Sequence, residues 1–191
     1  MSLEPTRRTF IQGTTAAMAA TIATRAWAAG SDTLRVGLIG CGGRGTGAAN
    51  QALLADPKTQ LTAVGDAFAD RVESSLSSLK KEADIAARID VPAERCFVGF
   101  DAYKKVIEHS DVVLLATPPN FRPLHLRAAV EASKHVFAEK PVAVDAPGVR
   151  SVLESCKMAE AKKLSVVSGL CMRYDGNCRD TIAKVHSGAI G

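Results

Sequence analysis

The segment Leu34-Arg35-Val36-Gly37-Leu38-Ile39-Gly40-Cys41-Gly42-Gly43-Arg44-Gly45 joins a short, branched apolar run to a cluster of glycines. A run of this kind that stops at glycines is typical of a buried β-strand. A helix is expected to follow over residues 45–54, and Asp56-Pro57 marks its end. The segment therefore predicts a strand, a glycine turn and a helix in succession.

The turn itself fits the pattern G-x-G-x-x-G, with glycines at 40, 42 and 45. In this pattern the first glycine permits a tight turn, the second lets the backbone approach a pyrophosphate, and the third packs the helix closely on the strand. Free N–H groups and a positive dipole at the helix start also favour phosphate. A purely structural glycine turn is the alternative, but the position between a strand and a helix favours dinucleotide binding.

An acidic residue supports this interpretation. Residues 61–65 (LTAVG) predict a second strand, and Asp66 is the first polar residue at its carboxyl end. A carboxylate about 20 residues after the glycine turn accepts a hydrogen bond from the adenosine ribose. It would repel a 2′-phosphate, so NAD is favoured over NADP. NADP is still an alternative cofactor, because the guanidinium of Arg44 or Arg71 could bind a 2′-phosphate.

Strands and helices alternate along the remaining sequence. We expect strands at 96–98, 112–116 (VVLLA), 135–138 (HVFA) and 164–167 (LSVV), and helices at 68–88, 102–108, 123–132 and 148–161. This alternation predicts an α/β fold of Rossmann type, a doubly wound parallel sheet with helices on both faces. Ligands bind such sheets outside the carboxyl ends of the strands.

Polar residues gather where the expected strands end, and they should therefore meet at one edge of the sheet. We take them as candidate cofactor-binding residues: Gly40, Cys41, Gly42, Gly43, Arg44, Gly45, Asp66, Thr117, Pro118, Asn120, Glu139 and Lys140.

In this order the motifs resemble the N-terminal half of the glucose–fructose oxidoreductase, inositol dehydrogenase and rhizopine-catabolism (Gfo/Idh/MocA) family. The resemblance rests on G-C-G-G-R-G, Asp66, A-T-P-P-N at 116–120 and K-H-V-F-A-E-K-P at 134–141, with His125 between the last two. The segment from Ser168 to Tyr174 resembles the family's entry into a second domain. The likeness covers residues 32–191, and the E-K-P tripeptide makes it specific.

The resemblance implies a sugar or polyol oxidoreductase, in which hydride passes between a carbinol carbon and the nicotinamide. Lys140 matches the lysine between cofactor and substrate, where an ammonium can hydrogen-bond the reacting oxygen; elsewhere a lysine is usually a solvated surface residue. The peptide before Pro141 is often cis in the family. His125 is a candidate cofactor contact or simply a helix residue. Arg173 and Tyr174 are candidate substrate contacts or surface residues.

The family continues into a second α/β domain that supplies most of the substrate pocket and the general base. We therefore expect residues 32–168 to form the NAD(P)-binding domain and residues 169–191 to begin the connection to a C-terminal domain that is absent beyond residue 191. This chain alone is then expected to lack turnover, and His186 is not assigned as the base. The full-length protein is expected to be a homo-oligomer.

Two alternatives are open. The first is a dinucleotide-binding module without turnover of its own. The second is an NAD-assisted glycoside hydrolase of the same family. Relatives of that kind often alter the E-K-P lysine, so Lys140 favours simple dehydrogenation.

Residues 1–28 predict an export signal. Arg7-Arg8 precedes a mildly apolar run rich in Ala and Thr, which ends in Ala26-Trp27-Ala28, as in twin-arginine signal peptides. The run is too short and too interrupted to span a membrane. A frayed N-terminus with two chance arginines is the alternative. Export predicts cleavage after Ala28 and a periplasmic or otherwise exported protein.

Composition limits the partners. With 47% hydrophobic and 23% charged residues, the sequence is globular rather than disordered or coiled-coil. Without residues 1–28 the net charge falls from +4 to +2, and the basic residues form no stripe, which argues against nucleic acid as a partner. The aromatic content of only 5% also argues against a base-stacking surface. No metal site is expected, because the cysteines form no C-x-x-C and lack histidines at zinc-ligand spacing. We interpret the five as small buried residues, with the last two as the nearest candidate disulfide pair: Cys41, Cys96, Cys156, Cys171 and Cys178.

Overall fold

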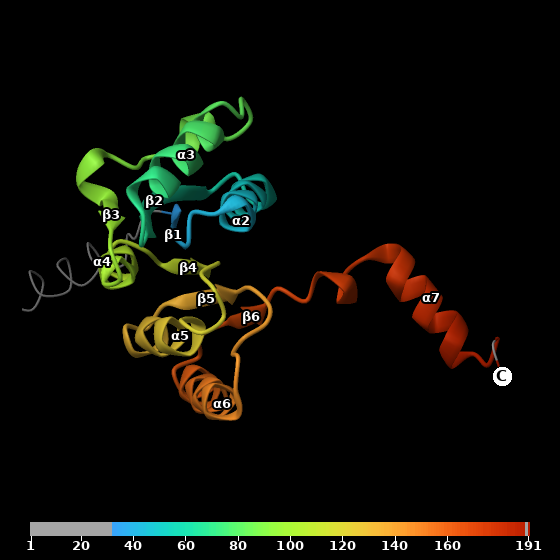
Figure 1. The fold of residues 1–191 in the computed structure, drawn as a ribbon. Coiled ribbons are helices and arrows are strands. Elements are labelled where there is room, and N and C mark those ends of the chain that lie inside the picture. The colour runs from blue at the N-terminus through green and yellow to red at the C-terminus, as the bar shows by residue number, and fades with distance from the viewer. Residues whose placement is uncertain (1–31, 190) are drawn as a thin grey trace, which may run out of the picture. The chain divides into compact units, whose positions relative to one another are not determined.

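Six parallel strands form one sheet in the order β3-β2-β1-β4-β5-β6 (Figure 1). The structure, a computed structural model, describes residues 32–189 and 191; the predicted signal at 1–28 lies outside the described residues. The strands are β1 (Leu34–Ile39), β2 (Thr59–Asp66), β3 (Cys96–Val98), β4 (Val112–Leu115), β5 (His135–Ala138) and β6 (Val166–Ser168).

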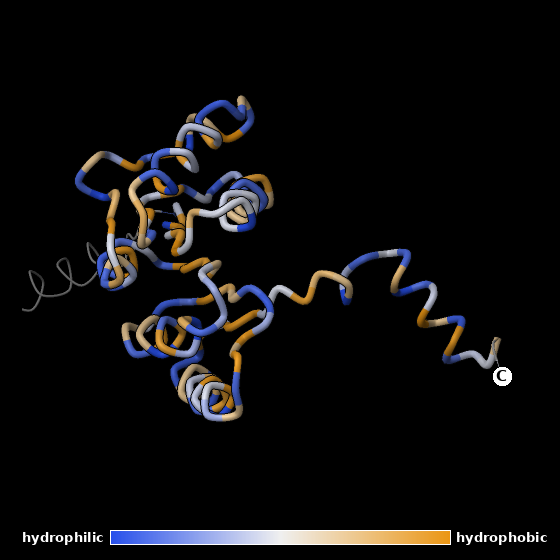
Figure 2. The backbone as a smooth tube through the Cα atoms, viewed as in Figure 1, coloured by the Kyte–Doolittle hydropathy of each residue, from blue (hydrophilic) through white to orange (hydrophobic). Residues whose placement is uncertain are grey.

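Helices cover both faces of the sheet. They are α2 (Gly43–Ala55), α3 (Ala69–Lys80), α4 (Ala102–Glu108), α5 (Arg122–Glu131) and α6 (Ala146–Ala161). The apolar residues of α2 and α3, such as Leu53 and Leu79, form one core with the sheet, whereas those of α4, α5 and α6 form a second core around Val106 and Leu126 (Figures 1 and 2). The predicted doubly wound α/β fold is confirmed.

The strand order creates a switch point between β1 and β4. The chain runs outward from β1 through β2 to β3, and then crosses to β4 on the other side of β1. The loops that follow β1 and β4 consequently leave in opposite directions and open a crevice at the carboxyl edge of the sheet, which is where such folds bind ligands.

Most predicted elements agree with the structure to within two residues at each end, and two of the differences have a cause in the packing of the core. The helix expected over 68–88 ends at Lys80, because the chain turns to bring the fully buried Ile85 into the same core as Leu79, and a 3₁₀ turn, η1 (Ala86–Arg88), follows. The last strand begins at Val166 rather than at residue 164, since Leu164 packs against the core of α4, α5 and α6.

The described chain ends in the 3₁₀ turn η3 (Cys171–Arg173) and helix α7 (Gly176–His186). The Asp175 carboxylate caps α7 by accepting the Cys178 N–H at 2.8 Å. No residue of α7 is buried, and Figure 2 shows hydrophilic and hydrophobic residues alternating along it.

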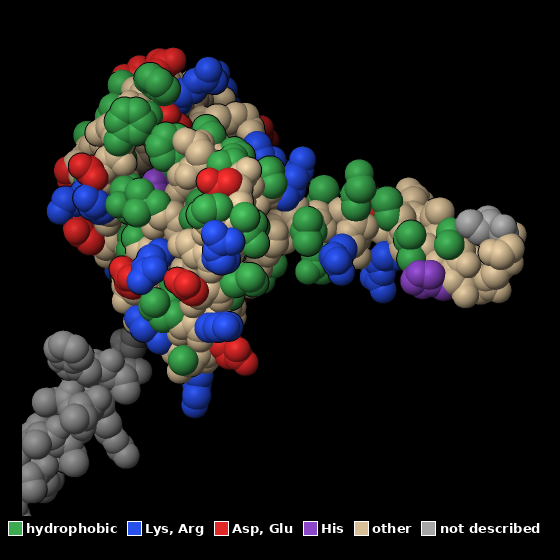
Figure 3. All heavy atoms as spheres, turned by 60° about the horizontal axis from the view of Figure 1, so that its bottom comes forward, with side chains coloured by type: hydrophobic (Ala, Val, Ile, Leu, Met, Phe, Trp, Pro, Cys, Tyr) green, Lys and Arg blue, Asp and Glu red, His purple; other side chains and the backbone are tan. Residues whose placement is uncertain are grey.

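The surface and the thiols bear on the remaining expectations. On the face shown in Figure 3, Lys and Arg side chains are interspersed with Asp and Glu. Within the described residues, no helix is long and apolar enough to cross a membrane.

All five cysteines are free. Cys41 is buried as expected, whereas Cys96, Cys156 and Cys178 are half-buried. The expectation of a buried cysteine was wrong for Cys171, which is exposed. Burial raises the pKa of the Cys41 thiol to about 12.

Candidate functional site

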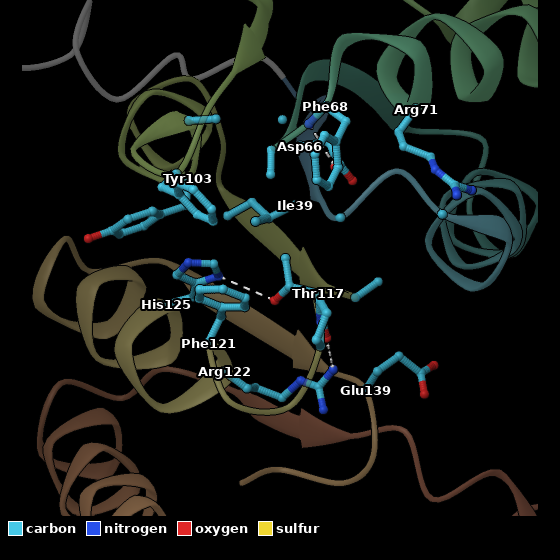
Figure 4. Close-up of a pocket in the computed structure, with 18 of the residues that line it drawn as sticks. Ile39, Asp66, Phe68, Arg71, Tyr103, Thr117, Phe121, Arg122, His125 and Glu139 are labelled. Carbon is cyan, nitrogen blue, oxygen red and sulfur yellow. Dashed lines mark hydrogen bonds between the residues drawn. The ribbon is translucent and has the colours of Figure 1, made fainter. Parts of the chain in front are cut away.

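A cavity of about 740 Å³ lies at the carboxyl edge of the sheet, around the switch point (Figure 4). This volume is within the range of small-molecule sites. Glycine-loop, strand-end and helix residues line it together: Ile39, Gly40, Gly42, Arg44, Gly65, Asp66, Ala67, Phe68, Arg71, Gly99, Phe100, Ala102, Tyr103, Ala116, Thr117, Pro118, Pro119, Phe121, Arg122, His125, Glu139 and Lys140.

The glycines of the first turn have distinct tasks. Gly40 has a φ of 97°, and a Cβ there would meet the Thr117 backbone nitrogen at 2.6 Å. A Cβ on Gly45 would lie 1.8 Å from the Gly40 carbonyl oxygen, so only glycine lets α2 approach β1 this closely. A Cβ on Gly42 would meet nothing within 4 Å. Gly42 therefore leaves open space on the cavity side, directly before the uncapped start of α2.

Asp66 links the glycine turn to the next strand. Its Oδ2 accepts the Cys41 N–H at 2.7 Å, and its Oδ1 accepts the Phe68 N–H at 3.1 Å. Each carboxylate oxygen can accept a further hydrogen bond. Asp66 thus fixes the turn and still offers an acceptor to a ligand in the cavity, with Arg71 of α3 on the same rim (Figure 4).

An aromatic wall on the α4 and α5 side was not predicted from the sequence. The His125 ring stacks on Tyr103, with centroids 4.3 Å apart, and on Phe121, with centroids 6.0 Å apart (Figure 4). The ring centroid of Phe100 lies 6.0 Å from that of Phe121. Burial, together with the nearby charge of Arg122, lowers the pKa of His125 to about 4. His125 is therefore a neutral imidazole at pH 7, with its Nδ1 3.4 Å from the Thr117 hydroxyl.

The E-K-P tripeptide forms the opposite end of the cavity. Glu139 is only 7% exposed, and its Oε1 accepts the Arg44 Nε–H at 2.6 Å. Lys140 is exposed and lines the cavity, so its ammonium is accessible to a ligand. The peptide between Lys140 and Pro141 is cis.

Arg122 is a second feature that the sequence did not indicate. It is the first residue of α5 and only 2% exposed. Its guanidinium donates hydrogen bonds to the carbonyl oxygens of Thr117 and Pro141, which belong to two different strand-end loops. A buried arginine whose partners are backbone carbonyls has no signature in the sequence, where arginine usually marks the surface.

The structure brings most of the predicted site residues to this one cavity: Gly40, Gly42, Arg44, Asp66, Thr117, Pro118, His125, Glu139 and Lys140. Cys41, Gly43 and Gly45 belong to the same turn but do not line the cavity, and Asn120 is exposed outside the lining. Arg173 and Tyr174 are exposed and do not line it; Arg173 borders a hollow formed by η3 and α7. In the described part of the chain, no group of three His, Cys, Asp or Glu side chains could hold a metal ion.

A doubly wound sheet with a glycine turn, an acidic strand end and a cavity at its switch point defines a dinucleotide-binding Rossmann domain. Residues 34–168 match the oxidoreductase family with an NAD-binding Rossmann fold that is named GFO_IDH_MocA, and the chain belongs to this family. The predicted family and cofactor class are confirmed.

Named relatives include dehydrogenases and a hydrolase. The chain is 33% identical to inositol 2-dehydrogenase 4 of Saccharopolyspora erythraea over 83% of this chain and 42% of the relative. It is 30% identical to a glycosyl hydrolase family 109 protein of Streptomyces coelicolor, and the match covers 83% of this chain and 32% of that relative. The scyllo-inositol dehydrogenase of Lactobacillus casei, whose structure was solved with NAD(H) and scyllo-inositol, shares the fold with a TM-score of 0.61. The two sequences are 22% identical, and the match covers 83% of this chain and 42% of that one. The chain thus spans less than half the length of these relatives.

Proposed function

We propose that this chain is the cofactor-binding part of an oxidoreductase that moves hydride between a carbinol carbon of a sugar or polyol and the nicotinamide of NAD. The observation that carries the proposal is that Lys140 lines the same cavity as the glycine turn and Asp66. The relatives named as inositol dehydrogenases support a cyclic polyol as the substrate.

The residues present fit a dinucleotide. The open space at Gly42 and the uncapped start of α2 would receive the pyrophosphate, and the Asp66 carboxylate would accept from the adenosine ribose. The nicotinamide would then lie toward Thr117, Glu139 and Lys140. The negative charge of Asp66 favours NAD over NADP.

When bound, the nicotinamide supplies the hydride acceptor. The Lys140 ammonium would donate a hydrogen bond to the reacting oxygen and stabilise negative charge on it. The neutral His125 and the aromatic rings stacked on it form an uncharged wall along one side of the cavity. We place the general base in the second domain that the family resemblance implies, and we expect the full-length protein to form a homo-oligomer.

Turnover by the full-length protein tests the proposal. NADH should appear with at least one member of a panel of inositols and aldoses, and Lys140→Met should slow its formation by about 10²–10⁴ while NAD binding persists. Residues 29–191 alone should bind NAD without turnover. Binding by the full-length protein with no turnover on any substrate would instead support a binding module.

The glycosyl hydrolase relatives give a second candidate function, an NAD-assisted glycoside cleavage. This reaction regenerates its cofactor, so p-nitrophenyl glycosides would release p-nitrophenol with no net formation of NADH. We favour dehydrogenation because Lys140 is present and accessible.

We propose that the protein is exported by the twin-arginine route to the periplasm. The proposal rests on Arg7-Arg8, the weakly apolar run and the Ala26-Trp27-Ala28 sequence. A reporter fused to residues 1–30 should be exported, and changing both arginines to lysine should retain it in the cytoplasm. A reporter that stays cytoplasmic with the unaltered sequence would refute export.

A further inference from the structure

Glu139 joins the glycine turn to the backbone of Lys140. Its Oε1 accepts the Arg44 Nε–H at 2.6 Å, and its Oε2 accepts the backbone N–H of Lys140 at 3.2 Å. A Cβ on Gly169 would lie 2.9 Å from the carboxylate, so a glycine after β6 leaves the room that Glu139 fills. The carboxylate is thus held by one partner from the glycine turn and by one from the backbone of Lys140.

Arg122 holds the other side of Lys140. One guanidinium nitrogen donates to the carbonyl of Pro141, immediately after the lysine, and another donates to the carbonyl of Thr117, after β4. The planar fork of an arginine can reach two carbonyls at once, whereas the single ammonium of a lysine cannot reproduce that geometry. The Arg122 Nε is buried without a hydrogen-bond partner among the described residues.

Retaining this buried cation is costly. Burial lowers the pKa of Arg122, which reflects the unfavourable desolvation of its charge. An apolar side chain would fill the space without this cost, but it could not join the loop after β4 to the loop after β5. The arrangement of donors thus favours a task at the ends of these strands over a contribution to stability alone.

We propose that Arg44 and Arg122 are positioning residues that hold the backbone of Lys140 from its two sides. The inference rests on the proposed role of Lys140 in hydride transfer. Arg44 belongs to the glycine turn, so the geometry of the cofactor loop is transmitted to Lys140 through Glu139. Arg122 holds the tripeptide against Thr117, at the proposed nicotinamide end of the cavity.

Amide hydrogen exchange on the cofactor-free, full-length protein tests the proposal without any turnover. Peptides covering residues 138–144 should exchange about tenfold faster in both Arg44→Gln and Arg122→Lys. In Arg44→Gln the cause is that Glu139, the acceptor of the Lys140 N–H, loses the partner that fixes it. In Arg122→Lys the cause is that the loop after β5 loses its hydrogen-bonded link to the loop after β4. Peptides from β1 and β2 should be unchanged. Arg127→Met is the matched control, since Arg127 lies on the same helix as Arg122 but pairs with Glu131 on the surface.

Kinetics separate positioning from general stability. Arg122→Lys should lower kcat about tenfold, with the Kd for NAD and the KM for the polyol changed by less than about twofold, and Arg127→Met should leave all three unchanged. Unaltered exchange in 138–144, or faster exchange spread over every strand, would overturn the proposal. Absence of turnover in the unaltered protein would refute the proposed function, while the exchange result would still decide the positioning of Lys140.

Discussion

Gly45 and Gly47 lie two residues apart on α2, yet replacing each by alanine should have opposite effects on stability. A Cβ on Gly45 would lie 1.8 Å from the Gly40 carbonyl oxygen and 3.1 Å from the Ala116 Cβ. A Cβ on Gly47 would meet only the far end of the Arg44 side chain, at 3.5 Å, which is ordinary contact. The same methyl group is therefore excluded at one position and accommodated at the other.

The magnitudes follow from two opposing terms. Alanine in place of glycine inside a helix stabilises by about 1 kcal/mol. Overpacking a core typically costs about 1–3 kcal/mol, and the obstacle at Gly45 is backbone that no rotamer change can relieve, so the upper end applies. Gly45→Ala should then lose about 2 kcal/mol of unfolding free energy, and Gly47→Ala should gain about 1 kcal/mol.

Urea denaturation of the two variants and the unaltered protein measures the difference, which should be about 3 kcal/mol. Comparing two variants of one helix cancels effects of composition and of the unfolded state, since both replace glycine by alanine. If Gly45→Ala were as stable as Gly47→Ala, the close approach of α2 to β1 would be refuted.

Three further substitutions address the cavity. Asp66→Asn keeps an acceptor for the Cys41 N–H but removes the charge, so the ratio of NAD to NADP affinity should fall about tenfold in a binding titration; an unchanged ratio would contradict the role of Asp66. Lys140→Met should lower kcat by about 10²–10⁴ with the Kd for NAD within about twofold, and equal losses in both would contradict a role in the reaction. His125 has a pKa of about 4 in the fold against 6.5 when unfolded, so the unfolded state binds the proton first. Stability should fall by up to about 3 kcal/mol from pH 6.5 to pH 4, and this extra slope should vanish in His125→Gln.

The strand pattern was predictable because apolar, branched runs bounded by glycine, proline and polar residues recur along the sequence. β3 and β5 begin and end where expected. The predicted helix after β2 is longer than the observed one, because the Glu, Lys and Ala residues beyond Lys80 also have a high helix propensity. Only the burial of Ile85 in the core ends it, and burial is a tertiary effect that local propensity does not contain.

The cavity was partly predictable for a similar reason. Residues at the carboxyl ends of parallel strands must share one edge, which places Asp66 and Lys140 together without knowledge of the side chains. The aromatic wall and Arg122 were missed, because Phe100, Tyr103 and Arg122 lie on helices or loops whose inward faces depend on packing between elements. Both acceptors of Arg122 are backbone carbonyl oxygens, and every residue has one, so the sequence gives no sign of these hydrogen bonds.

We propose that the open space at Gly42 receives the pyrophosphate of NAD. Calorimetric titration of NAD into the full-length protein and into Gly42→Ala tests it most directly, because a methyl group there touches no protein atom within 4 Å. We expect tight binding by the unaltered protein. For the variant we expect a Kd at least about tenfold higher, with an unchanged unfolding free energy. Equal affinity for NAD in the two proteins, or none in the unaltered one, would contradict it.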